Sequence, residues 1–214
     1  MIKEVCVENF SRVPLMIEKG ANRIELNNDL NIGGTTPSYG VIKQTINYAH
    51  NHEIPVVVMI RPRCGNFIYD QAEKDIMLDD IEICSQLEAD GVVFGCLTSE
   101  NTLDKDAMKS LIEKAKSLKM QVVMHMAFDE MPWDKQKETI EWLIQHRVDR
   151  ILTHGGNLSD PIAECLPHLR DIVNFAKDRI QILPGGGINV NNVDYVVDTL
   201  DLNQAHGTKI VLMS

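Results

Sequence analysis

The chain has 214 residues, of which 44% are apolar, and this length and composition exclude a disordered protein and suit one α/β domain. Its 31 acidic residues outnumber its 21 basic residues, and the net charge of −10 argues against non-specific binding to nucleic acid or to anionic membranes. The longest apolar run, Val56 to Ile60, is too short to span a bilayer, so we expect no membrane partner.

Strand-like and helix-like segments alternate along the whole chain, which favours βαβ units and a parallel sheet. Eight strands are predicted, at Ile2–Val7, Arg23–Leu26, Val56–Ile60, Gly91–Phe94, Gln121–His125, Arg150–Leu152, Gln181–Leu183 and Gln204–His206. Seven helices are predicted between them, at Ser11–Lys19, Tyr39–His52, Gln71–Leu87, Lys105–Leu118, Lys135–His146, Ile162–Ala176 and Asn191–Leu200.

This pattern predicts that residues 1–214 form a single TIM-like (β/α)8 barrel domain whose eighth helix is missing or rudimentary. Only eight residues follow His206, fewer than a helix of ordinary length needs. The groove between the seventh and first helices should then be covered by the tail Ile210–Met213 or by another subunit, so we expect a homo-oligomer.

Strand alternation predicts which side chains point toward the barrel axis. If the valines and isoleucines of each strand face the helices, Cys6, Glu25, Arg61 and His125 point inward. A buried carboxylate needs a cationic neighbour, and Arg61 on the adjacent strand is the predicted partner of Glu25. The alternative is that this pair is only a structural ion pair.

A glycine-rich turn, Pro184-Gly185-Gly186-Gly187, follows the seventh predicted strand, and His206-Gly207 ends the eighth. Loops after these two strands are the usual phosphate site of such barrels, and glycines let backbone N–H groups approach an anion closely. These residues therefore predict phosphate or carboxylate binding. The alternative is a tight turn that requires positive φ.

Arg61-Pro62-Arg63 places two guanidinium groups on either side of a rigid proline at the end of the third strand. Arginine forks suit carboxylate or phosphate groups, so both residues are candidate anion ligands. The alternative is one buried arginine that pairs with Glu25 and one solvated arginine.

His125 and Asp129 follow the fifth strand and offer an imidazole and a carboxylate near one pocket, a pairing that suits acid–base catalysis. With Glu25 they form the predicted catalytic set. The alternative is a satisfied core histidine, with Asp129 capping a helix.

The five cysteines are scattered, and no pair has C-x-x-C spacing, so reduced thiols in a cytoplasmic protein are expected. Lys3 and Glu4 also interrupt the start of the chain, where a secretory leader would need an apolar run. Cys6, the one cysteine predicted to face the barrel interior, is a candidate Cu(I) ligand, because Cu(I) prefers thiolate. The alternative is an inert buried cysteine.

Several segments together resemble the CutC family, which is named for copper homeostasis. The resemblance is carried by Glu4-Val-Cys-Val-Glu8, Gly20-Ala-Asn-Arg-Ile-Glu-Leu26, Gly33-Gly-Thr-Thr-Pro-Ser38, Val58-Met-Ile-Arg-Pro-Arg63, Asp90-Gly-Val-Val-Phe-Gly95, Ala127-Phe-Asp129, Arg150-Ile-Leu-Thr153, Pro184-Gly-Gly-Gly187 and His206-Gly207. It implies a cytoplasmic, often oligomeric TIM-like barrel linked to copper handling. Family members often carry a second cysteine, proposed as a copper ligand, where this chain has Asn27.

Two functions follow from these observations. The resemblance implies a copper-handling protein that binds Cu(I) through Cys6, with help from methionine or histidine. The residues of the barrel mouth instead favour an enzyme acting on a small anionic or phosphorylated metabolite, with Glu25 or Asp129 as base and His125 as acid or electrophile.

Overall fold

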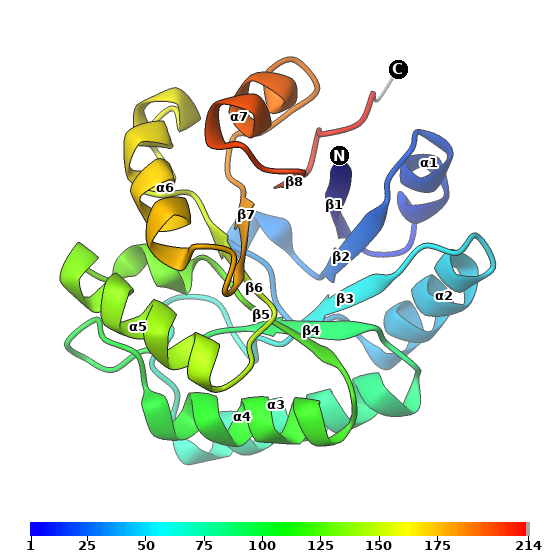
Figure 1. Cartoon of the computed structure of the whole chain (residues 1–214). Helices are drawn as coiled ribbons and strands as arrows, with labels where there is room; N and C mark the ends of the chain where they lie inside the picture. Colours follow the sequence, from blue (N-terminus) through cyan, green and yellow to red (C-terminus); the bar gives the residue numbers. More distant parts are fainter. Residues whose placement is uncertain (213–214) are drawn as a thin grey trace.

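The computed structural model describes residues 1–212, in which eight parallel strands form a nearly closed barrel surrounded by seven α-helices (Figure 1). The strands are β1 (Ile2–Glu8), β2 (Arg23–Asn27), β3 (Val56–Met59), β4 (Gly91–Phe94), β5 (Gln121–Met124), β6 (Arg150–Thr153), β7 (Gln181–Pro184) and β8 (Gln204–Gly207). The α-helices are α1 (Val13–Glu18), α2 (Tyr39–His50), α3 (Gln71–Gln86), α4 (Lys105–Ser117), α5 (Trp133–Gln145), α6 (Ile162–Ala176) and α7 (Val193–Leu200), and two 3₁₀ helices are η1 (Leu30–Ile32) and η2 (Met126–Glu130). The predicted TIM-like barrel is confirmed.

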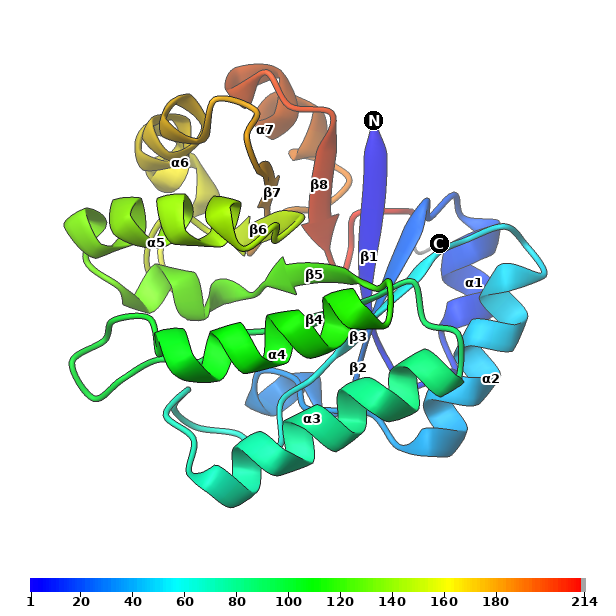
Figure 2. The same ribbon diagram turned by 60° about the horizontal axis from the view of Figure 1, so that its bottom comes forward.

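The hydrogen-bonded strand order is β7-β6-β5-β4-β3-β2-β1-β8, so the last strand pairs with the first. Figure 2 shows β8 alongside β1, and the register places His206 beside Glu4. The side chain of Gln204 on β8 also reaches toward β7 and donates a hydrogen bond to the carbonyl of Ile182 at 3.3 Å. Residues from the two ends of the chain are thereby brought into one site.

Local signals in the sequence explain where several elements begin and end. Gly20, directly after the C-cap residue of α1, has φ +94°, a conformation that favours glycine. Asp104 is the N-cap of α4, because its side chain accepts a hydrogen bond from the Ala107 N–H at the start of the helix.

Each strand divides its side chains between two apolar layers. Val5 and Val7 of β1 belong to the large core between the sheet and the helices. A second, smaller core fills the barrel axis, and it consists of Val57, Met59, Val93, Val123, Leu152 and Leu183. The predicted alternation is therefore correct, and the polar residues that share the inward face meet above this inner core.

No eighth helix follows β8 within residues 1–212, and the C-terminal segment runs between α7 and α1 (Figure 1). Ile210 and Val211 are buried in the outer core, whereas Leu212 is 63% exposed. The tail thus contributes two residues to the position that a helix normally covers, while Met213 lies outside the described residues. In the described part of the chain, none of the helices combines the length and the apolar character required to cross a membrane.

Candidate functional site

A cavity of about 610 Å³ opens at the carboxyl ends of the strands, where the active sites of such barrels lie. Most of the residues that the sequence predicts for the site line this cavity: Cys6, Glu25, Arg61, His125, Gly186, Gly187, His206 and Gly207. The remaining three, Arg63, Asp129 and Gly185, do not line it.

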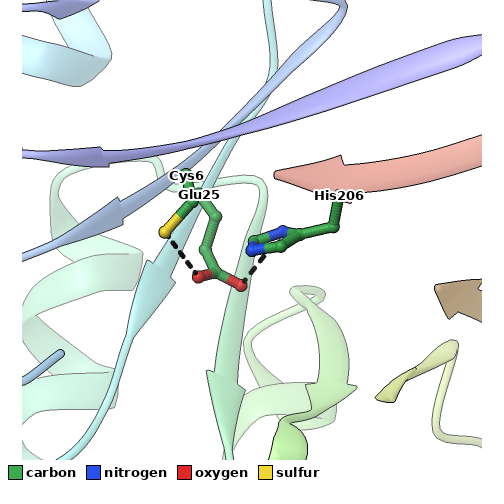
Figure 3. Close-up of side chains that lie close together, drawn as sticks. All are labelled: Cys6, Glu25 and His206. Atoms are coloured by element: carbon green, nitrogen blue, oxygen red, sulfur yellow. Dashed lines mark hydrogen bonds and ion pairs between the residues drawn. The ribbon is translucent and has the colours of Figure 1, made fainter. Parts of the chain in front are cut away.

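Cys6, Glu25 and His206 form a buried cluster contributed by β1, β2 and β8 (Figure 3). Each offers one potential metal-ligand atom, and these atoms lie within 4.8 Å of one another. Cys6 Sγ donates to Glu25 Oε1 at 3.6 Å, and His206 Nδ1 lies 3.9 Å from Glu25 Oε2. The parallel register explains the arrangement, because Cys6 is directly opposite Glu25 on neighbouring strands.

Asn27 completes the polar contacts of the cluster. Its Nδ2 donates to Glu25 Oε1 at 2.9 Å and to Cys6 Sγ at 3.4 Å. Asn27 therefore holds the thiol and the carboxyl in place.

Glu4 contacts the cluster through a hydrogen bond to His206, a role that the sequence did not predict. Its carboxylate accepts a hydrogen bond from His206 Nδ1 at 2.8 Å and forms an ion pair with Arg23. Glu4 and Cys6 are two residues apart on β1, so strand alternation puts them on the same face, and this was the available signal. The partner on β8, 202 residues away, becomes visible only in the folded barrel.

The charges of the cluster follow from burial and from these contacts. Burial, reinforced by Glu25, raises the pKa of the Cys6 thiol to about 11. Burial alone would lower the pKa of His206, but the nearby Glu25, Cys6 and Glu4 outweigh it and raise that pKa well above its ordinary value. Burial also raises the pKa of Glu25, whereas contacts to His206 and Arg23 overcome burial at Glu4 and lower its pKa to about 2. At neutral pH the Cys6 thiol is therefore neutral, and the carboxylate of Glu4 favours the protonated imidazolium of His206.

The predicted ion pair between Glu25 and Arg61 is wrong. The two terminal nitrogens of Arg61 donate instead to backbone carbonyls, to Gly33 at 3.0 Å, Gly34 at 3.1 Å and Gly65 at 2.6 Å. β3 ends at Met59, so Arg61 lies beyond the ladder and reaches the loops after β2 and β3. His206 takes the place beside Glu25 that the sequence assigned to Arg61.

His125 is a neutral side chain at the end of β5. Its Nδ1 accepts the N–H of Ala127 at 3.1 Å, which leaves the hydrogen on Nε2, and Nε2 has no partner among the described residues. Burial and then the nearby Arg61 lower its pKa to about 3. Phe67 packs on the ring, with centroids 4.8 Å apart.

Asp129 stabilises the turn that follows β6 by accepting hydrogen bonds. It accepts the backbone N–H groups of His154 at 2.8 Å and Gly155 at 3.1 Å, and also the Thr153 hydroxyl. Burial raises its pKa to about 6. Asp129 faces a separate cavity of about 340 Å³, so the structure does not bring it together with Glu25 and His125.

Arg63 and Gly185 also lie outside the main cavity. Arg63 forms an ion pair with Glu73 of α3 and donates to the carbonyl of Ile68 at 2.6 Å. A Cβ at Gly185 would lie 2.7 Å from side-chain atoms of Leu152 and Met126, so close packing explains this glycine.

The other glycines of the predicted anion site do line the cavity. Gly186 and Gly187 have φ +79° and +70°, so the alternative of a turn that requires positive φ describes both. A Cβ at Gly207 would lie 2.4 Å from the carbonyl oxygen of Ile188, so its small size permits the approach of two backbone segments.

Comparisons with known proteins agree on one family. The model of the CutC family matches residues 1–211. A CutC protein from Enterococcus faecalis is 49% identical over 211 residues, covering 99% of this chain and all of the relative.

Solved structures give the same result. A CutC protein from Streptococcus agalactiae, described as a candidate copper homeostasis protein, has a TM-score of 0.94 and 41% identity, covering 99% of this chain and 100% of that one. Deoxyribose phosphate aldolase from Aeropyrum pernix, with a TM-score of 0.72 at 10% identity over 97% of this chain and 86% of that one, shares the fold alone. The match to the family model and the relatives in sequence and structure confirm the resemblance: this chain belongs to the CutC family, whose name refers to copper homeostasis.

Proposed function

We propose that this protein handles copper by binding Cu(I) at Cys6 Sγ and the imidazole of His206, with Glu25 as a weaker third donor. The observation that supports it is the convergence of these three side chains, with ligand atoms within 4.8 Å of one another. Cu(I) prefers sulfur ligands and also accepts imidazole nitrogen, so Cys6 and His206 are the two donors suited to it. The relation of CutC proteins to copper homeostasis supports the same choice.

The ligands must lose protons before they bind the metal. The pKa of the Cys6 thiol is about 11, and the pKa of His206 lies well above its ordinary value. Binding should therefore release protons and tighten as the pH rises. Asn27 supplies no sulfur, so the proposed site has one thiolate.

An anaerobic Cu(I) competition titration tests this proposal. Cys6→Ser should weaken Cu(I) binding at least about a hundredfold, which is about 2.8 kcal/mol at 25 °C. The matched control is Cys64→Ser, because Cys64 is an exposed thiol that does not line the cavity and its loss should leave the tight site intact. Equal affinities of wild type and Cys6→Ser would reject Cys6 as the ligand.

We place this activity in the cytoplasm. All five cysteines are free, including the buried Cys6, and reduced thiols are typical of cytosolic proteins. Fractionation of cells that express the native chain, probed with an antibody, tests the location; recovery outside the cytosolic fraction would contradict it.

We also propose that the protein assembles as a homo-oligomer through the side that lacks an eighth helix. Leu15 on α1 is 39% exposed and Tyr195 on α7 is 60% exposed, and these helices flank the C-terminal tail. Light scattering should give a mass above that of one chain, and Tyr195→Ser should lower it; a monomeric wild type would contradict the proposal.

An acid–base enzyme at the same mouth is the second function that we consider. Glu25 and His125 both line the cavity, and burial displaces the pKa of each from its ordinary value, as is common for catalytic groups. A screen of phosphorylated and carboxylated metabolites for turnover, with His125→Gln as the control, tests this function. If turnover is unchanged in His125→Gln, His125 takes no part in the catalysis.

A further inference from the structure

The cavity is far larger than a metal ion requires. Its volume of about 610 Å³ is typical of pockets that enclose small organic molecules. Much of its wall is apolar, with contributions from Met59, Phe67, Leu152 and Ile188, whereas the Cys6–Glu25–His206 cluster occupies the part formed by β1, β2 and β8. The part at the ends of β3 and β5, which carries Arg61 and His125, is left for a second ligand.

Arg61 brings a buried positive charge to this part of the cavity. The side chain is 5% exposed, and its hydrogen bonds within residues 1–212 go to backbone carbonyls, without a carboxylate partner. Its Nε has no hydrogen-bond partner in the same range. Arg23 and Arg63, in contrast, pair with Glu4 and Glu73. A buried charge without a counter-ion is costly, and an anionic ligand would supply the missing partner.

Arg150 is also buried, and two of its nitrogens have no partner among the described residues. It begins β6, at the opposite end of the barrel, and does not line the cavity. Arg61 thus differs from Arg150 because it lines the cavity, and from Arg23 and Arg63 because it has no carboxylate partner among the described residues.

His125 supplies a second unused N–H beside Arg61. The side chain is 4% exposed, and Nε2 carries the hydrogen because Nδ1 accepts from Ala127. Phe67 contacts both residues, with its ring centroid 4.8 Å from the Arg61 guanidinium carbon and 4.8 Å from the His125 ring centroid. Both side chains therefore border the same aromatic ring, and both line the cavity in which an anionic group could accept their N–H groups.

The strand β2 offers complementary acceptors. Glu25 Oε2 and Asn27 Oδ1 are buried and have no hydrogen-bond partner among the described residues. Buried polar atoms are normally satisfied, so unpartnered donors and acceptors around one cavity indicate a ligand with both kinds of group.

We propose that the mouth cavity binds a small organic anion whose carboxylate or phosphate group accepts hydrogen bonds from Arg61 Nε and His125 Nε2. Hydroxyl or amino groups on the rest of the molecule donate to Glu25 Oε2 and Asn27 Oδ1. The free atoms are covered in the present conformation, so side chains at the mouth, among them Phe67 beside Arg61, must move to admit the ligand. This site shares Glu25 with the proposed copper site but requires no metal, and it rests on the second function proposed above, for which it names the groups that hold the ligand.

Binding of glycerol phosphate, glycerate and glycerol to the metal-free full chain tests the proposal by calorimetry and thermal shift. The first two probes carry a phosphate or a carboxylate on a hydroxylated skeleton, and glycerol is their neutral counterpart. One of the two anions should bind saturably, and glycerol should not. His125→Phe and Arg61→Gln should each weaken binding at least about tenfold, the loss expected for one charge-assisted or buried hydrogen bond. Arg63→Gln is the matched control and should bind as wild type does.

A measurement on the wild type covers the case in which Arg61→Gln fails to fold. Titration of the anion into ¹⁵N-labelled protein should move the His125 Nε2 resonance. Whichever of glycerol phosphate and glycerate binds more tightly shows whether the site prefers phosphate or carboxylate. Three results would each overturn the proposal: no saturable binding of either anion at millimolar concentration, binding that is unchanged in His125→Phe, or binding of glycerol as tight as that of the anions.

Discussion

Two buried histidines line the mouth cavity of this barrel, and their neighbours give them opposite properties. His206, on the part formed by β1, β2 and β8, lies beside Glu4 and Glu25, and its pKa is raised well above the ordinary value. His125, at the end of β5, lies near Arg61, and its pKa is lowered to about 3. Both residues are at most 6% exposed, so the difference comes from the neighbouring charges and not from burial.

The two parts of the cavity therefore suit different ligands. The Cys6–Glu25–His206 cluster is internally hydrogen-bonded and offers metal donors after loss of protons. The part around Arg61 and His125 keeps unpartnered N–H groups and a positive charge without a counter-ion. One cavity can thus combine a metal and an organic anion.

The largest expected effect is the loss of stability on removal of the Glu4 carboxylate, which pairs with both His206 and Arg23. Glu4→Gln leaves Arg23 and His206 without their shared carboxylate, and such a loss in a buried pair destabilises by about 3–5 kcal/mol. Urea unfolding measures this change. The exposed Glu113→Gln, which loses only the surface pair with Lys109, should cost less than about 1 kcal/mol. Similar losses for the two variants would show that the buried network contributes little.

The pH dependence of stability should separate the two histidines. Between about pH 3 and its ordinary value of 6.5, His125 is neutral in the folded chain but protonated in the unfolded chain, so its contribution to stability is lost as the pH falls. Wild type should lose about 1.4 kcal/mol per pH unit relative to His125→Gln in that window.

His206 has the opposite sign. Its raised pKa gives stability that is fully present below pH 6.5 and is lost as the pH rises through the higher folded value. Urea unfolding across pH, together with NMR titration of both imidazoles, measures these effects. A common midpoint for the two rings would contradict the comparison.

A third change would sharpen the metal-binding part of the site. Asn27 contacts Cys6 Sγ at 3.4 Å, so Asn27→Cys places a second thiol beside the first. A second thiolate should tighten Cu(I) binding at least about tenfold. The same anaerobic titration measures it, with Asn27→Ser as the control for loss of the amide. An increase in affinity for Asn27→Ser as well would assign the effect to the lost amide.

The smallest effect concerns the reactivity of the two cysteines near the mouth. Cys6 is 8% exposed and has a pKa of about 11, so it should react with iodoacetamide far more slowly than the exposed Cys64 at neutral pH. Its rate should rise about tenfold per pH unit below that pKa. Peptide mass spectrometry reads both sites in one sample, and equal rates would show that Cys6 is accessible and ionised.

Much of the architecture was predictable because it depends on local patterns. The alternation of Val5 and Val7 identified Cys6 as inward, and that of Ile24 and Leu26 identified Glu25, while short apolar runs separated by helical segments identified the barrel. The sequence predicted a missing or rudimentary eighth helix, and no helix follows β8 within residues 1–212. The motifs of the CutC family were also present in the sequence, and this assignment is confirmed.

The partners of the charged groups were decided by the tertiary structure. Alternation shows that Glu25 points inward, but the position of Arg61 beyond the end of β3 sends its guanidinium to loop carbonyls, and closure of β8 against β1 brings His206 to Glu25 instead. The same closure places Glu4 under His206. The sequence alone therefore determined the fold and the faces of its strands, which are local properties. Only the folded barrel determined the ion pairs and pKa values, because these depend on distances between residues that are far apart in the chain.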